Sequence, residues 1–122
     1  MGVTRREGRL YLTVRTMETE GHSMMPLKKE ESRERETAAI LLEESVVRLK
    51  LEVEFTNMQD TASFYYRGAG LQVRNPWVKA GGEHKLYFKL DHFTGCRFGL
   101  VVYSTEEAGG SAEFRDFVYR DR

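Results

Sequence analysis

The segment Val47–Phe55 alternates strictly between apolar and charged side chains. Apolar residues take every odd position, and arginine, lysine or glutamate takes every even position. Because successive side chains of a β-strand point to opposite faces, this period of two predicts a strand with one face in a core and one in water. A helix does not fit, since its apolar residues recur every three or four positions.

A polar segment and a second alternating run follow this strand. Thr56–Asp60 is polar apart from Met58, and in the run that follows Ala62, Phe64 and Tyr66 alternate with Ser63, Tyr65 and Arg67. Polar residues of these types favour turns. The two runs and the turn between them are therefore predicted to form an antiparallel hairpin.

Other alternating segments predict further strands. They are Leu10–Arg15, Phe98–Tyr103 and Ala112–Tyr119. The last changes phase near Arg115, as a β-bulge would cause. Leu86–Leu90 is either another strand or an ordered loop.

The segment Pro26–Glu44 has two interpretations. Its charged part, Lys28–Glu36, has a composition that favours a helix by intrinsic propensity. No apolar stripe runs through it at helical spacing, which instead favours a solvated hairpin tip or flexible loop leading into a short strand, Thr37–Leu42. Turns or breaks are expected at Gly81-Gly82 and Gly109-Gly110.

These segments together predict an all-β chain. Six or seven short strands with turns between them, and no alternating helices, are typical of an antiparallel β-sandwich. We expect one domain over residues 1–122. Leu10–Thr16 is expected at a sheet edge, which a second copy of the chain would cover in a homo-oligomer.

Charge and cysteine content exclude several classes of partner and site. The 19 basic residues balance the 19 acidic ones, so no long-range field attracts nucleic acid or an anionic membrane. No apolar run is long enough to cross a bilayer, and Met1–Glu7 lacks the apolar core of a signal peptide, so a cytoplasmic location is expected. Cys96 is the single cysteine, which excludes an internal disulfide and a thiolate metal cluster within one chain.

Several stretches resemble a known family. His92–Leu100 and Tyr103–Phe117 resemble the end of the C-terminal domain of glycoside hydrolase family 43 enzymes, the β-xylosidases and α-arabinofuranosidases. Val47–Val53 and Ala62–Arg67 are similar to a strand and its return strand in that domain. The resemblance is strongest over residues 46–120 and implies a jelly-roll sandwich of the concanavalin A-like lectin/glucanase type.

The resemblance also implies a function. In that family hydrolysis is performed by three acidic residues of a catalytic propeller, so we expect the present residues alone to be non-catalytic and to need no cofactor. They resemble the last part of the domain, a shortened or partial copy, and Glu113 and Arg115 stand where the family has two aspartates. The implied role is to support or close the active site of a separate propeller in plant-polysaccharide metabolism.

One loop is implicated by the resemblance. His92 and Phe93 occupy the loop that, in these enzymes, helps to close the propeller's pocket with an aromatic side chain. The alternative is that Phe93 anchors this loop in the sandwich.

Acidic and histidine residues offer little as catalytic or metal sites. The pairs Glu43-Glu44 and Glu106-Glu107 are neighbours along the chain, which on a strand point to opposite faces and do not converge on one substrate. The histidines, at His22, His84 and His92, lack metal-binding spacing. They are expected at the surface or at the edge of the core.

Aromatic residues offer a second class of site. A pyranose stacks its apolar face on a flat ring, and the candidates are Trp77, Tyr65, Tyr87 and Tyr103. Trp77 follows Pro76 in a loop-like stretch, and the alternative is that it caps one end of the core. The chain is accordingly an accessory domain of a glycosidase, a stand-alone module that binds xylo-oligosaccharides, or a self-assembling structural unit.

Overall fold

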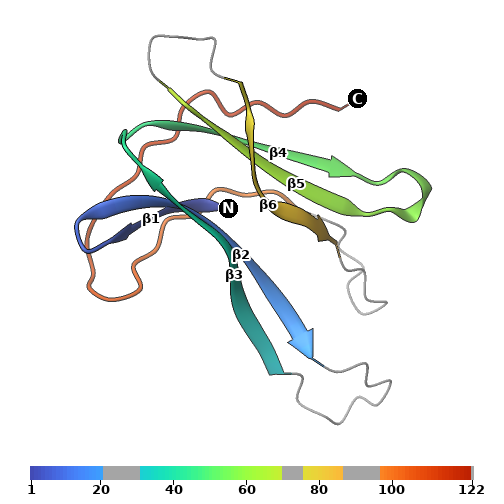
Figure 1. The fold of residues 1–122 in the computed structure, drawn as a ribbon, viewed down its shortest axis with the longest axis horizontal. Helices are drawn as coiled ribbons and strands as arrows, with labels where there is room; N and C mark the ends of the chain where they lie inside the picture. The colour runs from blue at the N-terminus through green and yellow to red at the C-terminus, as the bar shows by residue number, and fades with distance from the viewer. Residues whose placement is uncertain (21–30, 70–75, 87–96, 122) are drawn as a thin grey trace. The chain divides into compact units, whose positions relative to one another are not determined.

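The computed structural model describes residues 1–20, 31–69, 76–86 and 97–121. The chain divides into two units, Met1–Tyr87 and Phe88–Arg122, and each is described by itself. The elements of the first unit (Figure 1) are β1 (Gly2–Arg6), β2 (Arg9–Glu20), β3 (Glu31–Leu42), β4 (Val47–Glu54), the 3₁₀ turn η1 (Thr56–Met58), β5 (Thr61–Gly68) and β6 (Val78–Lys85).

The first unit is built from two antiparallel sheets. Each has three strands, in the orders β1-β2-β3 and β4-β5-β6. This arrangement confirms the predicted all-β class and is that of a concanavalin A-like sandwich. Among the described residues, no helix is long and apolar enough to span a membrane.

The predicted hairpin is present as β4 and β5. The strands pair in antiparallel register, with Leu51 opposite Phe64. In the turn between them, the backbone N–H of Thr56 donates to the Glu54 carboxylate at 2.7 Å. Asn57 adopts a positive φ of 55°, which asparagine tolerates better than most residues.

A small apolar core lies between the two sheets. Leu12 and Val14 of β2 and Ala80 of β6 are fully buried, and Phe64 and Tyr66 of β5 pack against them. The even positions of β5 therefore face inward, as the alternation predicts. Burying one such leucine or valine stabilises the fold by about 1.5–3 kcal/mol.

The apolar face of β4 is less covered than its pattern predicts. Leu49 and Leu51 lie opposite Tyr66 and Phe64 and share their face of the sheet, yet remain 40% and 39% exposed. Within the first unit, the buried cluster centres on β2, β5 and β6. The predicted orientation of the face is right, but its complete burial is not observed.

In the first sheet, β2 occupies the centre and not the edge. It pairs with β1 on one side and β3 on the other, so the predicted edge position of Leu10–Thr16 is wrong. The buried hydroxyl of Thr13 is hydrogen-bonded to that of Thr4 on β1, at 2.8 Å. Sequence reasoning missed β1 because the segment is short and two arginines fall within it.

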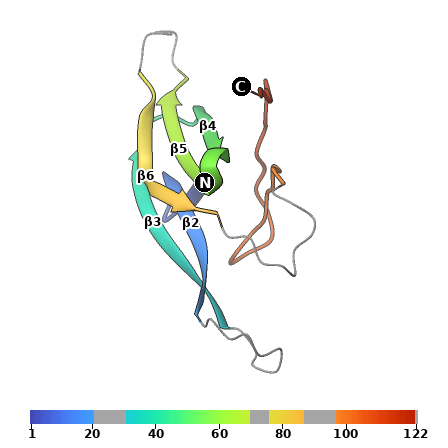
Figure 2. The same cartoon turned by 90° about the vertical axis from the view of Figure 1, so that its right-hand side faces the viewer.

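The strand β3 resolves the two interpretations of the charged segment. Residues 31–42 are all strand, so the predicted strand Thr37–Leu42 is confirmed, while helix and flexible loop are both wrong for residues 31–36. Residues 21–30, where a hairpin tip was the other alternative, lie outside the described part. The β2–β3 ladder projects beyond the second sheet (Figures 1 and 2). Residues 33–37 of β3 are exposed and four of these five are charged, which their exposure to water permits at little desolvation cost.

Ion pairs join the three strands of this sheet on its polar face. The Glu36 carboxylate on β3 accepts hydrogen bonds from Arg6 of β1 and Arg15 of β2, and Arg15 also pairs with Glu34. The hydrogen bond from Arg6 lowers the pKa of Glu36. Arg6 therefore helps to hold β1 in the sheet.

The strand β6 runs through Gly81-Gly82, where the sequence predicts a turn or break. Gly81 has a φ of 68° and lies where the register between β5 and β6 shifts, so the glycine pair permits an irregular strand to continue. A Cβ at Gly81 would lie 3.3 Å from the Thr37 hydroxyl oxygen. The glycine therefore allows β6 to approach β3 closely.

In the second unit, the described residues 97–121 form no hydrogen-bonded strand. The strands predicted at Phe98–Tyr103 and Ala112–Tyr119 are not observed there. The rings of Phe98 and Tyr119 nonetheless lie 6.4 Å apart. Asp116, with a φ of 55°, marks a backbone irregularity one residue from the predicted phase change, and the single-domain assignment stays a prediction.

We expect the Leu12→Ala variant to lose about 2–5 kcal/mol of unfolding free energy, because it leaves a cavity in the core. Leu41→Ala on β3, where the leucine is 50% exposed, is the matched control and should lose less than about 1 kcal/mol. Urea unfolding followed by circular dichroism measures both. Equal losses would place Leu12 outside the core.

Candidate functional site

The outer face of the β4-β5-β6 sheet gathers cations and aromatic rings. Arg48 lies opposite Arg67, and Lys50 opposite Tyr65, in the β4–β5 ladder. Lys79 of β6 lies opposite Tyr65 on its other side. Residues directly opposite one another share a face, so all five lie on the face away from the core.

Trp77 joins this face from the start of β6. The next residue, Val78, lies opposite Tyr66, whose side chain packs on the core. Side chains alternate along a strand, which directs Trp77 outward. The Trp77 ring therefore contacts the outer face and does not cap the core.

Three close contacts link these side chains. The Lys50 Nζ lies 4.4 Å from the Tyr65 ring centroid and 5.1 Å from that of Trp77. The Arg67 Cζ lies 4.4 Å from the Trp77 centroid. We call Lys50, Tyr65, Arg67 and Trp77 the cation–aromatic cluster. All four side chains are half-buried, and each cation–π contact contributes about 0.5–1 kcal/mol at such sites.

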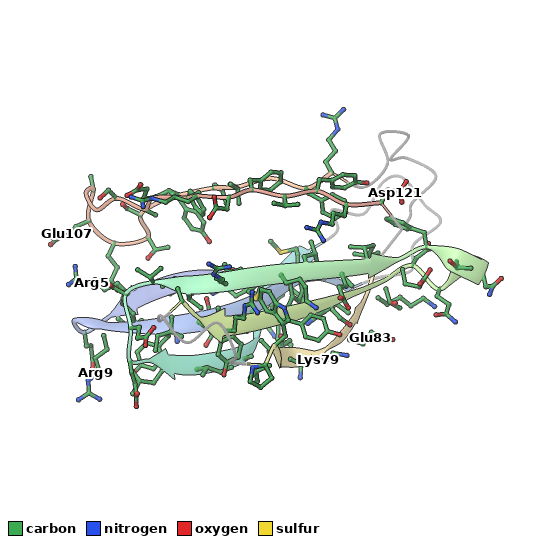
Figure 3. The ribbon with its side chains drawn as sticks, turned by 90° about the horizontal axis from the view of Figure 1, so that it is seen from above. Arg5, Arg9, Lys79, Glu83, Glu107 and Asp121 are labelled. Carbon is green, nitrogen blue, oxygen red and sulfur yellow. The ribbon has the colours of Figure 1, made fainter. Side chains whose placement is uncertain are left out.

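The charges around the cluster are unevenly distributed. Arg48 and Lys79 add two cations at the end of the sheet where Trp77 lies. Glu52, on the same strand, pairs with Lys50 at 2.8 Å. Glu83 lies further along β6 than Lys79 (Figure 3). Basic groups thus predominate around the two rings.

The structure brings together two of the predicted site residues. Tyr65 and Trp77 share the ammonium group of Lys50, while Tyr103 belongs to the second unit and is 64% exposed. His92 and Phe93 lie outside the described residues, as does Tyr87, so the loop prediction stays untested.

Sequence reasoning missed Lys50 and Arg67 as members of a site. Both were assigned to the water-facing side of the hairpin, which is their position. Assuming a ladder register across the Thr56–Asp60 turn would have placed Lys50 beside Tyr65. No sequence signal indicated that Trp77 returns to the same face, because it immediately precedes β6, a strand that was not predicted.

Neither acidic pair lies on a strand, so the expected opposite-face arrangement stays untested. Glu43 and Glu44 are exposed in the bend after β3, and Glu106 and Glu107 are exposed in a bend of the second unit. Within residues 1–20, 31–69, 76–86 and 97–121, no three histidine, cysteine or acidic side chains are grouped to hold a metal.

His84 lies at the edge of the core, as one of the predicted alternatives has it. Its ring meets Phe64 edge to face, with centroids 5.2 Å apart. The Nε2 atom is buried without a hydrogen-bond partner among the described residues. Burial lowers the pKa of His84, and the positive charges of the Met1 amino group and Lys79 lower it further.

Comparison with known proteins gives one match. A model of the family described as beta xylosidase C-terminal concanavalin A-like domain matches residues 3–120 of the 122-residue chain. The match covers almost the whole sequence, including both units. No curated protein and no solved structure matches the chain significantly.

The lowered pKa of His84 predicts a pH dependence of stability. Below its ordinary value of about 6.5, the unfolded chain binds a proton that the folded chain resists, so stability should fall as the pH falls through this value toward the folded pKa. His84→Gln removes the titration and should flatten this part of the profile.

Urea unfolding at a series of pH values between about 5.5 and 7.5 measures this dependence around the histidine pKa. His84→Gln is compared with the wild type at each pH. Parallel profiles for the two proteins would show that His84 does not titrate differently on folding.

Proposed function

Because the chain belongs to the beta xylosidase C-terminal concanavalin A-like domain family, we propose that it supports a separate catalytic propeller of glycoside hydrolase family 43 and helps to close its active site. The family is an accessory, non-catalytic part of carbohydrate-degrading enzymes. The observation that carries the proposal is the match over residues 3–120, which leaves almost none of the 122 residues outside it.

The placement of the acidic residues supports a non-catalytic role. Hydrolysis of a glycosidic bond by the usual mechanism needs two carboxyl groups that face each other across the substrate, about 5–10 Å apart. Glu52 is engaged by Lys50 and Glu36 by two arginines. These carboxylates stabilise sheets, which is a structural use and not a catalytic one.

The proposed closing residue is Phe93, with His92 beside it. This assignment rests on the resemblance of His92–Leu100 to the family's loop. An aromatic side chain that covers a pocket excludes water and orients substrate, which raises the rate without taking part in proton transfer.

A second candidate function is carbohydrate binding at the cation–aromatic cluster. It is favoured by the meeting of Tyr65 and Trp77 around Lys50, at 4.4 and 5.1 Å. Flat rings with polar groups at their edges are the usual elements of a sugar site. The two functions are compatible, because the cluster and the Phe93 loop are separate parts of the chain.

The proposed accessory role is tested by reconstitution. The propeller of a family 43 β-xylosidase, produced without its C-terminal domain, is assayed on 4-nitrophenyl β-D-xyloside with and without this chain. The chain alone should give no turnover. Its addition should raise kcat/KM of the propeller by about tenfold or more, since closure of the pocket orients the substrate.

Phe93→Ala should abolish the increase in kcat/KM while leaving binding to the propeller intact in calorimetry. The matched control is Tyr119→Ala, which removes an exposed aromatic ring of the second unit and should change neither quantity. Turnover by the chain alone that disappears on a Glu→Gln substitution would contradict the proposal, as would the lack of any complex.

A further inference from the structure

The cation–aromatic cluster contains a repulsive arrangement that an anion would relieve. Arg48 and Arg67 lie directly opposite each other on β4 and β5, and like charges in this position destabilise a ladder. Lys50 and Lys79 flank Tyr65 on its two sides. The chain as a whole has no net charge, so this is a local excess confined to one end of one sheet face.

The ring faces of the cluster are already occupied. Arg67 lies over Trp77 at 4.4 Å, and Lys50 lies over Tyr65 at the same distance. A neutral pyranose needs an open ring face to stack on, so it would have to displace a cation. A ligand that uses the cations loses nothing, because the contacts can remain while it binds.

A stacked arginine is also well prepared to bind a carboxylate. The guanidinium group carries five N–H donors in its own plane, and Arg67 lies over the Trp77 ring with its Cζ 4.4 Å from the ring centroid, a contact that uses none of these donors as a hydrogen bond. Two parallel N–H groups match the two oxygens of a carboxylate. Lys50 lies within reach of both rings, and although its ammonium group pairs with Glu52, an ammonium group has three N–H donors, so others remain for a ligand.

We propose that the cation–aromatic cluster binds an oligosaccharide that carries uronic acid residues. Arg67 and Lys50 bind the carboxylate, and Arg48 and Lys79 add electrostatic attraction for it. The sugar ring lies against the edges of the half-buried Tyr65 and Trp77 rings, whose faces keep their cations. The inference rests on the proposed carbohydrate-related function and narrows its ligand to acidic saccharides.

Trp77 is the single tryptophan of the chain, so its fluorescence reports on this cluster alone. We expect a glucuronic-acid-substituted xylotetraose to change the emission and to bind at least about tenfold more tightly than unsubstituted xylotetraose, a difference of about 1.4 kcal/mol. Binding should weaken as salt is added, since the charges are close to the surface. Citrate, a carboxylate without a sugar ring, should bind more weakly than the acidic saccharide.

Arg67→Met should weaken binding of the acidic saccharide by about tenfold or more, and Arg67→Lys should weaken it less, because the charge remains while the planar fork is lost. Lys50→Met tests the second donor. The matched control is Arg9→Met, which removes an exposed cation from the other sheet and should leave affinity unchanged. Circular dichroism and thermal unfolding verify that each variant is folded.

Three results would overturn the inference. Equal affinity for the neutral and the acidic saccharide would mean that the cluster does not recognise charge. Equal affinity for citrate and the acidic saccharide would mean that it does not recognise the sugar. An unaltered Trp77 emission at millimolar saccharide would mean that it binds neither saccharide. Activation of the propeller by Phe93 is measured separately. If acidic saccharide binding fails while activation persists, only this inference fails, and the reverse outcome removes only the accessory role.

Discussion

The antiparallel register between β4 and β5 is the constraint on which both the core and the site depend. It sets Leu51 against Phe64 and Lys50 against Tyr65. Since the side-chain period is two, a slip by one residue would exchange the two faces of either strand. Phe64 would then leave the core around Leu12 and Val14, and Tyr65 would leave its cations. The core and the cation–aromatic cluster therefore depend on the same strand register.

Burial of apolar side chains and exposed ion pairs contribute different amounts to the stability of the fold. Fully burying a leucine or valine contributes about 1.5–3 kcal/mol, while an exposed ion pair contributes at most about 1 kcal/mol. Leu12 and Val14 therefore dominate stability, and the pairs around Glu36 chiefly fix the alignment of β1, β2 and β3. The cation–aromatic cluster lies on the opposite face of the β4-β5-β6 sheet from the core.

Strands were predicted correctly from the sequence where the alternation of apolar and polar residues matches the buried and exposed faces of the sheet. The hairpin of β4 and β5 was predicted with its turn, because Val47–Phe55 alternates without a break. The charged half of β3 was not predicted, since its strand form depends on partners in β2 and β1. The strand β6 was missed because Gly81 serves a close approach to β3 and not a turn. Of the cluster, Tyr65 and Trp77 were identified by residue type, while Lys50 and Arg67 acquire their role only from cross-strand register.

The most direct test of this account is a nuclear Overhauser experiment on the Lys50 side chain. We expect cross-peaks from its ε-methylene protons to the ring protons of Tyr65 and Trp77. Cross-peaks from Leu49 to the Tyr65 ring, with Lys50 close to Phe64 instead, would show that the β4–β5 register is shifted by one residue. That result would contradict both the core and the site described for this chain.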